Sequence, residues 1–287
     1  MDKEDIKRDF ILLNVGAAKH NADWNWKDVH SPFARIHFVR RGSAKIIRED
    51  GTFNLRKNHL YLTPSYTRHT YECNGPLELY YLHIYEDLGR NLSIFDLINF
   101  PVEVEADSLV ASLIRRLIDI NPKRELLFYD PRSYDNSSTL ADNIARQKSV
   151  PPAYELETQG ILTQIFSRFL VKAEYKNRDI EKRILRSLRY IHKNIEQAID
   201  LNYLAKVNFL TKDHFIRLFK KEMKCTPWKY INQKRIETAQ LKLLIDDTTI
   251  KDIAYSMGYD SLPYFNLMFK KITGETPGSY KKKTRLR

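Results

Sequence analysis

The sequence predicts an α+β chain of two domains: an N-terminal antiparallel β-barrel or sandwich with accompanying helices, and an all-helical C-terminal domain. Three observations support this division. Strand-like segments fill residues 33–85, helical periodicity fills the chain after a polar stretch at residues 176–179, and the excess positive charge is confined to the second part. Residues 1–177 hold 24 basic and 24 acidic residues, so residues 178–287 hold 24 basic and 12 acidic ones, the whole net charge of +12. We expect domains at residues 1–176 and 177–287, the second an autonomous module that binds a polyanion.

Four short strands and two helices are expected in the N-terminal domain. The segments FARIHFV, SAKIIRE, LYLTP and ELYYLHIY are rich in β-branched and aromatic residues, and turn residues such as Gly42, Pro64 and Gly75 separate them. Helical periodicity follows at residues 107–120 and 154–175. The expected buried stripes are Leu109, Leu113, Leu117 and Ile118 in the first helix, and Ile161, Ile165, Phe166 and Phe169 in the second.

An internal repeat fills most of the C-terminal domain. Residues 201–227 and 250–277 share matching positions, among them Ala205 with Ala254, Phe215 with Phe265, and the Thr-Pro pairs at 226–227 and 276–277. Each copy fits a helix, a turn and a second helix. Thr211 and Ser261 are suitable N-caps for the second helices, and Gly258 and Gly274 suit left-handed turn positions in the second copy. The second helices also carry apolar stripes, which are Phe215, Leu218 and Phe219 in the first copy and Phe265, Met268, Phe269 and Ile272 in the second.

A helix over residues 227–245 is expected to join the two copies. Nineteen residues at about 1.5 Å each give roughly 28 Å. This length is close to one DNA turn of about 34 Å, which would present two recognition helices to successive major grooves. Two helix-turn-helix units on a basic domain therefore indicate DNA binding.

The segment IKDIAYSMGYDSLPYFNLMFKKITGETPGSYKK resembles the signature of the AraC/XylS family of transcription regulators, and the resemblance covers roughly the last 110 residues, including a helix expected at residues 179–199. Phe209 and Lys224 differ from the family, whose first unit often has Gly there, and Leu267 stands where its second unit often has Arg. A looser resemblance, through LYLTPSYTRHTY, implies a cupin-like barrel as the sensor domain, whose helices commonly mediate dimerisation in this family.

Outward-facing positions on the second helix of each unit are the candidate DNA contacts. In the first unit Arg217 is the main candidate for reading guanine, and Ile216 could meet a thymine methyl group. In the second unit Asn266 could read adenine, although that helix has few polar residues. Lys220, Lys221, Lys270 and Lys271 are expected to bind phosphates. The full set is Lys212, Asp213, Ile216, Arg217, Lys220, Lys221, Leu262, Pro263, Asn266, Leu267, Lys270 and Lys271.

A ligand pocket is expected inside the barrel. Leu79, Tyr81 and His83 share one face of a strand. The resemblance to the family's sugar sensor places Arg41, Tyr71 and Tyr81 near pocket positions, so the candidate ligand-binding residues are Arg41, Tyr71, Tyr81 and His83. Aromatic faces with one Arg would suit a sugar or a small acid, and an ordinarily packed barrel is the alternative. The barrel histidines lack a paired His-x-His motif, so no metal and no cofactor are expected.

Together these features predict a sequence-specific DNA-binding transcription regulator that responds to a small-molecule effector and forms a homodimer. We expect no catalytic residues. The charged start MDKEDIKRDF is unlike a signal peptide, the two cysteines suggest no disulfide framework, and no long apolar run suggests a membrane span, so a cytoplasmic location is expected. Two alternatives stay open: a metal-dependent cupin enzyme with a DNA-binding appendage, and an effector-free architectural DNA-binding protein.

Overall fold

The computed structural model describes residues 9–87, 92–135, 143, 150–175, 182–245 and 248–283. The chain forms two compact units. Unit 1 comprises Met1–Asp87 and Ile98–Glu174, and unit 2 comprises Leu88–Leu97 and Tyr175–Arg287. The segment Leu88–Leu97, which interrupts unit 1 in the sequence, thus belongs to unit 2. No helix in the described residues is long and apolar enough to cross a membrane.

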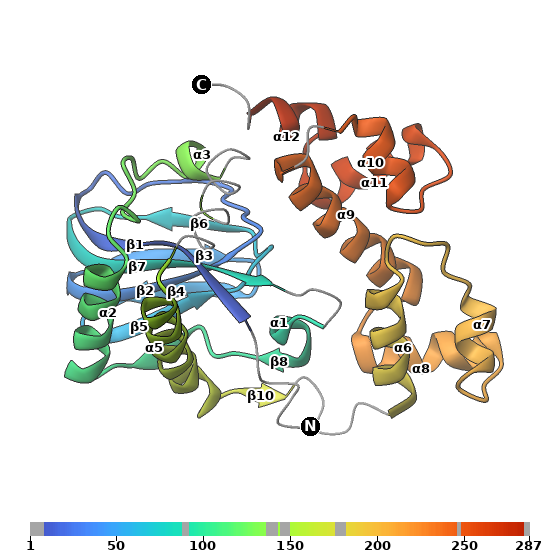
Figure 1. Ribbon diagram of the computed structural model, residues 1–287, viewed down its shortest axis with the longest axis horizontal. Coiled ribbons are helices and arrows are strands. Elements are labelled where there is room, and N and C mark those ends of the chain that lie inside the picture. The colour runs from blue at the N-terminus through green and yellow to red at the C-terminus, as the bar shows by residue number, and fades with distance from the viewer. Residues whose placement is uncertain are drawn as a thin grey trace. The chain divides into compact units, whose positions relative to one another are not determined.

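Unit 1 is built on two antiparallel sheets (Figure 1). The larger sheet has the strand order β1-β7-β2-β5-β9, and the smaller one the order β4-β3-β6. A third pairing joins β8 (Ile98–Asn99) with β10 (Glu174–Tyr175). The strands are β1 (Asp9–Asn21), β2 (Ala34–Gly42), β3 (Ala44–Arg48), β4 (Gly51–Leu55), β5 (His59–Thr63), β6 (His69–Glu72), β7 (Pro76–Asp87) and β9 (Glu103–Glu105).

The expected strands are present, but the longest strand, β1, was not predicted. Its apolar start FILL and its middle GAA give no strict alternation. It is fixed by pairing with β7 from Asp9↔Asp87 to Asn21↔Pro76, a contact between residues far apart in the sequence. A core packs between the two sheets, where Ile46 of β3 and Leu55 of β4 meet Val39 and Leu79 of the larger sheet. This arrangement confirms the sheet-rich N-terminal half.

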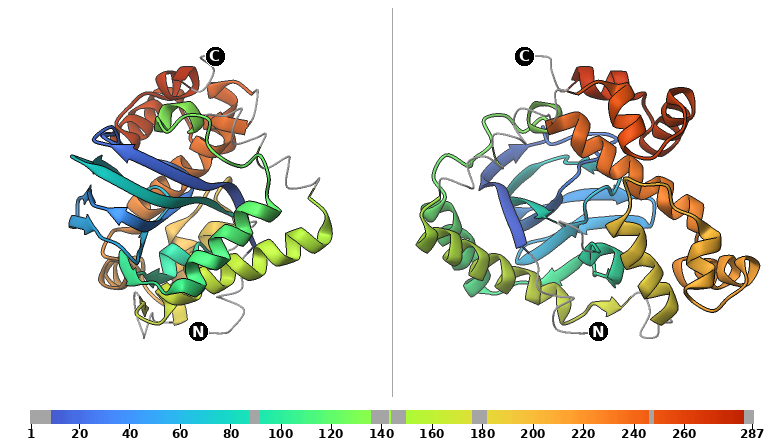
Figure 2. Two further views of the ribbon diagram at one scale, coloured as in Figure 1. Left: turned by 90° about the vertical axis from the view of Figure 1, so that its left-hand side faces the viewer. Right: turned by 45° about the vertical axis from the view of Figure 1, so that its right-hand side comes forward.

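Helices α2 (Ser108–Ile120) and α5 (Pro152–Leu170) lie side by side and contact β1 (Figures 1 and 2). The face expected for the second helix is buried, and Phe166 stacks on Phe10 of β1 at 4.3 Å between ring centroids. The stripe expected for the first helix was wrong except at Leu117. α2 buries Val110, Ile114, Leu117 and Ile120, whereas Leu109 is 49% exposed. The buried stripe is thus turned around the helix from the expected one, with Leu117 common to both, because α2 packs against α5 and β1.

Unit 2 is helical in its described part, apart from the β10 end residue. A long helix, α9, joins two groups of shorter helices, with α7 and α8 near its start and α10 and α11 near its end (Figure 1). The bounds are α1 (Ile94–Leu97), α6 (Lys182–Lys193), α7 (Leu201–Lys206), α8 (Lys212–Met223), α9 (Pro227–Ile245), α10 (Ile250–Ser256), α11 (Leu262–Thr273) and α12 (Pro277–Lys283). Unit 1 additionally contains the short helix α3 (Pro131–Tyr134).

Candidate nucleic-acid interface and ligand cavity

The first helix-turn-helix unit consists of α7 and α8. Ala205 is buried between them, and the Leu210 N–H donates to the Ala205 carbonyl across the turn. Phe209, the turn residue, has a φ of 56° and a side chain that is 91% exposed. A left-handed residue is required here, which explains why Gly suits this position. Thr211 then caps α8 by accepting a hydrogen bond from the His214 N–H, as expected for this residue.

The second unit, α10 and α11, repeats this geometry. Gly258 provides the left-handed turn residue with a φ of 70°, and Gly274 ends α11 with a φ of 88°. Ser261 caps α11 by accepting from the Tyr264 N–H. Both predicted N-caps and both turn glycines are therefore confirmed. The joining helix α9 has the predicted bounds, Pro227–Ile245.

Arg235 of α9 holds the second turn in place. Its guanidinium donates to three backbone carbonyls: Ile195 at 3.2 Å, Gln197 at 2.6 Å and Gly258 at 2.9 Å. The Arg235 side chain is almost fully buried. Since one side chain satisfies acceptors from the segment after α6 and from the second turn, it fixes the position of that turn on the joining helix.

The helices α8 and α11 present equivalent faces. Each has twelve residues and two buried phenylalanines, Phe215 and Phe219 in α8 and Phe265 and Phe269 in α11. Of the predicted contacts, those exposed to solvent are Lys212, Asp213, Arg217, Lys220, Lys221, Pro263, Leu267, Lys270 and Lys271, while Ile216, Leu262 and Asn266 are half-buried. Within the described part of the chain, Arg217 and the four paired lysines form no ion pair, so their charges are free for an anionic partner.

Two exposed residues on these helices were not predicted as contacts. His214 and Tyr264 lie in the first turn of α8 and α11, and Tyr264 is 48% exposed. Both are one residue before a buried phenylalanine, a position that helical geometry puts at the edge of the outward face. Their spacing from the N-cap, three residues in each helix, is the signal that could have identified them.

A buried ionic cluster holds α1 against α9 within unit 2. Lys234 Nζ lies 2.7 Å from Asp96 Oδ1 and 2.8 Å from Glu237 Oε2. The Tyr230 hydroxyl donates to Asp96 Oδ2 at 3.5 Å, and His192 Nε2 lies 2.8 Å from that hydroxyl. Burial alone would lower the pKa of Lys234, but the two carboxylates outweigh it and raise the pKa, so the amine is charged. Nothing in the sequence pattern pointed to this cluster.

Unit 1 contains a small pocket between its sheets that is partly open to solvent. Its wall is aromatic and histidine-rich, and Leu79, Tyr81 and His83 contribute from one face of β7 as expected. The lining residues are Ala18, His20, Trp24, Arg35, His37, Tyr71, Leu79, Tyr81, His83, Leu126, Tyr129 and Tyr134. The cavity thus brings together three of the four predicted ligand-binding residues: Tyr71, Tyr81 and His83.

Arg41, the fourth, lies elsewhere. It is exposed near the end of β2 and does not line the cavity; Arg35 supplies the guanidinium instead. Alternation along β2 from Arg35 through His37 and Val39 would bring Arg41 to the same face. A register shift between β2 and β7 at Val39/Arg41 breaks that alternation near the end of the strand.

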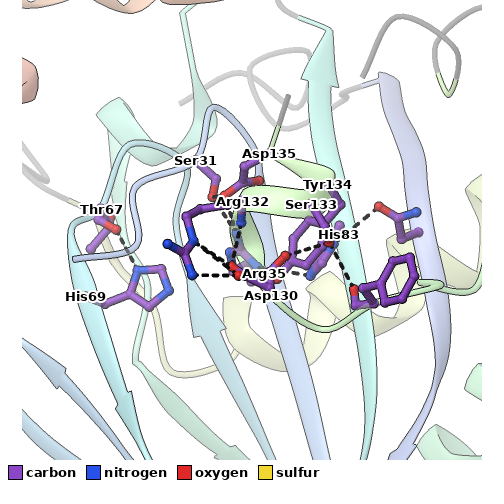
Figure 3. A network of polar contacts seen from close by, with 12 residues as sticks. Ser31, Arg35, Thr67, His69, His83, Asp130, Arg132, Ser133, Tyr134 and Asp135 are labelled. Carbon is purple, nitrogen blue, oxygen red and sulfur yellow. Dashed lines mark hydrogen bonds and ion pairs between the residues drawn. The ribbon is translucent and has the colours of Figure 1, made fainter. Parts of the chain in front are cut away.

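Arg35 is fully buried and already paired (Figure 3). Its Nη2 lies 2.8 Å from Asp135 Oδ2, and its Nη1 donates to the Tyr134 hydroxyl at 2.7 Å and lies 3.2 Å from His83 Nε2. Burial, with the nearby Arg35 charge, lowers the pKa values of His37 and His83 well below their ordinary value. The lining histidines are therefore neutral, and a guanidinium among them disfavours a bound cation.

Three buried polar atoms of the cavity lining have no hydrogen-bond partner within the described part of the chain. They are Arg35 Nε, His37 Nδ1 and the Tyr71 hydroxyl. An unpartnered buried polar atom costs about 1–3 kcal/mol. Three of them around one cavity indicate that a polar molecule could complete their hydrogen bonding.

Comparison with known proteins assigns the chain to a family. A family model described as an AraC-like ligand binding domain matches residues 13–127, and one described as a helix-turn-helix domain matches residues 204–283. The TetD protein of transposon Tn10 from Escherichia coli is 32% identical over 113 residues, which are 39% of this chain and 82% of TetD. The chain belongs to the AraC/XylS family of transcription regulators.

Two Bacillus subtilis relatives match over part of their length. AdaA, named a bifunctional transcriptional activator and DNA repair enzyme, is 35% identical over 97 residues, 34% of this chain and 46% of AdaA. YdeC, named an HTH-type transcriptional regulator, is 29% identical over 134 residues, 45% of this chain and 46% of YdeC. The matches thus span less than half the length of either relative.

A crystal structure of ToxT from Vibrio cholerae shares the fold of this chain. Its TM-score is 0.52 at 14% identity, covering 98% of this chain and 100% of ToxT. At this identity the likeness concerns the fold alone. It supports the two-part architecture of a sheet-rich domain and a helical domain.

Proposed function

We propose that this protein is a transcription regulator that binds double-stranded DNA through α8 and α11 and whose DNA binding responds to a small polar effector in the unit 1 cavity. The observation that carries the proposal is the pair of equivalent helices joined by α9, each with unpaired exposed lysines. Family membership supports it. YdeC is named a transcriptional regulator and AdaA a transcriptional activator and DNA repair enzyme, and we propose regulation without catalysis for this chain.

The DNA-binding proposal is tested by comparing Arg217 with Lys220 and Lys221. Arg217 lies in the middle of α8, whereas the two lysines lie in its last turn. Recognition helices read bases mainly through their N-terminal part. Arg217→Ala should weaken binding to a selected site by about 1–3 kcal/mol and binding to random DNA less. Lys220→Ala or Lys221→Ala should weaken binding to the selected site and to random DNA alike. Each should also reduce the slope of log affinity against log salt concentration by about one unit.

The measurement is titration of each variant on a duplex selected from a random pool and on random DNA, at several salt concentrations. Equal weakening of both duplexes by Arg217→Ala would show that Arg217 contacts only phosphate. Absence of any salt-dependent affinity for DNA in the folded full chain would refute the proposal itself.

The effector is proposed to be a neutral polar molecule such as a sugar, in preference to a small acid. Asp135 already compensates the Arg35 charge, and the lining histidines are neutral, so the cavity offers no free positive charge to a carboxylate. Burying an uncompensated carboxylate would cost several kcal/mol. Trp24 and Tyr71, which stack at 4.0 Å, provide the aromatic surface.

Tyr71→Phe gives a sharp test of this site. Removing an unpartnered buried hydroxyl should leave the stability of the unliganded protein unchanged or raise it, while removing one hydrogen bond to the effector. A thermal-shift screen of sugars and small acids identifies a stabilising compound, because a ligand that binds only the folded state raises its stability. Arg41→Ala is the control, since Arg41 lies outside the cavity. Full ligand stabilisation in Tyr71→Phe would place the effector elsewhere.

A homodimer is proposed to form through α2. Leu109 is 49% exposed and Leu113 half-buried, and the two lie one turn apart, outside the stripe that α2 buries. Leu109→Lys should lower the dimer fraction measured by sedimentation without reducing the melting temperature. An unchanged dimer would exclude this surface.

A further inference from the structure

The outward faces of α8 and α11 have the same geometry and opposite chemistry. Aligned by their buried phenylalanines, residues of α8 match residues of α11 fifty positions later, and the outward positions coincide, except that Lys212 is exposed whereas Leu262 is half-buried. On α8 these positions hold Lys212, Asp213, His214 and Arg217. On α11 they hold Leu262, Pro263, Tyr264 and Leu267. One face is charged and polar, and the other is almost entirely apolar.

Most of the outward face of α11 lies outside the core of unit 2, although Leu262 packs against that core. Phe265 and Phe269 fill the buried side of the helix, with Met268 and Ile272 packed beside them. Leu267 is nevertheless 62% exposed and Tyr264 48% exposed. An exposed apolar patch on a folded surface indicates contact with a partner that has apolar groups.

Charge complementarity indicates DNA as that partner. Lys270 and Lys271 follow Leu267 in the last turn of α11 and are exposed, without an ion pair in the described part of the chain. The same lysine pair stands at the same place on α8, at Lys220 and Lys221. A protein partner with an apolar surface would have no need of these two charges, whereas phosphates flanking a groove would bind both.

In the major groove, thymine presents the only apolar group, its 5-methyl. A leucine cannot pair with the oxygen and nitrogen atoms of guanine, and covering them would leave buried acceptors without partners. Asn266, half-buried beside this face, is the residue on it that could pair with adenine through its amide. The chemistry of α11 therefore matches A·T pairs with thymine methyls turned toward the helix.

We propose that α11 reads thymine methyl groups through Leu267 and Tyr264, so that the operator has two unlike halves, one read by polar groups of α8 and one thymine-rich half read by α11. This rests on the proposed DNA-binding function and names its specificity-determining residues. The first half of the operator depends on Arg217, and the second on apolar contact.

The test replaces thymine by uracil, which removes only the methyl group. Using the full chain and a duplex selected from a random pool, each thymine is replaced in turn and the Kd measured. Replacing a thymine in the half that faces α11 should weaken binding of the protein about four-fold, the fold-change that corresponds to ~0.8 kcal/mol for one buried methylene. Uracil in the other half should change the Kd less than two-fold.

Leu267→Ala assigns the effect to the side chain. The variant should bind the thymine duplex more weakly and show no further loss on the uracil duplex, since the contact is already absent. Arg217→Ala, at the matched position of α8, is the control and should keep the full uracil effect. Leu267 is exposed, so neither the fold nor the melting temperature should change.

Three results would overturn the proposal: no thymine sensitive to uracil, an undiminished uracil effect in Leu267→Ala, or wild-type affinity of Leu267→Ala for every duplex. The last would indicate that the apolar face binds a protein. Loss of all DNA binding by the unaltered chain would instead refute the proposed function, and the two failures are therefore distinguishable.

Discussion

Removing Asp96 should destabilise unit 2, although this residue lies far from the other unit 2 helices in the sequence. The side chains of Asp96 and Lys234 are only 15% and 14% exposed, and Asp96 Oδ1 lies 2.7 Å from Lys234 Nζ. Breaking a buried pair by deleting one partner costs about 3–5 kcal/mol when the remaining charge has no compensation. Glu237 remains 2.8 Å from Lys234 and offsets part of that cost. We expect Asp96→Ala to lower the free energy of unfolding of unit 2 by about 2 kcal/mol.

The assay is urea unfolding of the full chain, followed by circular dichroism at 222 nm, which reports mainly on the helices. Lys234→Met and the double variant complete a double-mutant cycle. Because the two charges interact, the double variant should cost less than the sum of the single variants, with a coupling of about 1–3 kcal/mol. Asp119→Ala, an exposed carboxylate of α2, is the control and should change stability by less than about 0.5 kcal/mol.

The same cluster bears on the expectation that residues 178–287 form an autonomous module. This fragment lacks α1, including Asp96 and the buried Ile94, Phe95 and Leu97. It should be less stable than unit 2 in the full chain, and Lys234→Met should recover part of the loss by removing a buried charge that has lost one of its two carboxylate partners. The reasoning is refuted if Asp96→Ala stays within 0.5 kcal/mol of the unaltered chain and the fragment unfolds at the same urea concentration as unit 2.

Three further perturbations have defined outcomes. Burial lowers the pKa of His69 to about 3 and the pKa values of His37 and His83 well below 6.5, so below pH 6.5 the unfolded chain binds more protons than the folded one. The free energy of unfolding of unit 1 should therefore fall by about 1.4 kcal/mol per histidine between pH 7.5 and 5.5. Urea titrations at the two pH values measure this loss, and His69→Gln should reduce it by about a third. Phe209→Gly should raise stability by about 0.5–1 kcal/mol, because a φ of 56° strains a residue with a side chain; a lower melting temperature would contradict this. Gly258→Ala should destabilise unit 2 by more than about 1 kcal/mol, since its Cβ would lie 2.6 Å from Arg235 Nη2 at a φ of 70°, and unchanged urea unfolding would refute the strain.

Local patterns of the C-terminal half were enough to predict its helices. N-caps, turn glycines, Thr-Pro helix starts and buried phenylalanines act within a few residues, so their spacing carried over into the structure at Thr211, Ser261, Gly258 and Pro227. The positive φ at Phe209 shows the same logic. Phe209 has the left-handed backbone conformation that the turn requires, although it is not a glycine.

The sequence by itself determined the family, the two-part α+β division, the repeated helical units and the outward faces of their second helices, because these depend on periodicity, local hydrogen bonds and charge. Tertiary structure alone decided which arginine enters the cavity, since a register shift after Val39 turns Arg41 outward and leaves Arg35 inside. It also decided which face α2 buries and that Asp96 pairs with Lys234, 138 positions later in the sequence. Such contacts join residues that no local pattern connects, and only packing of the whole chain selects them.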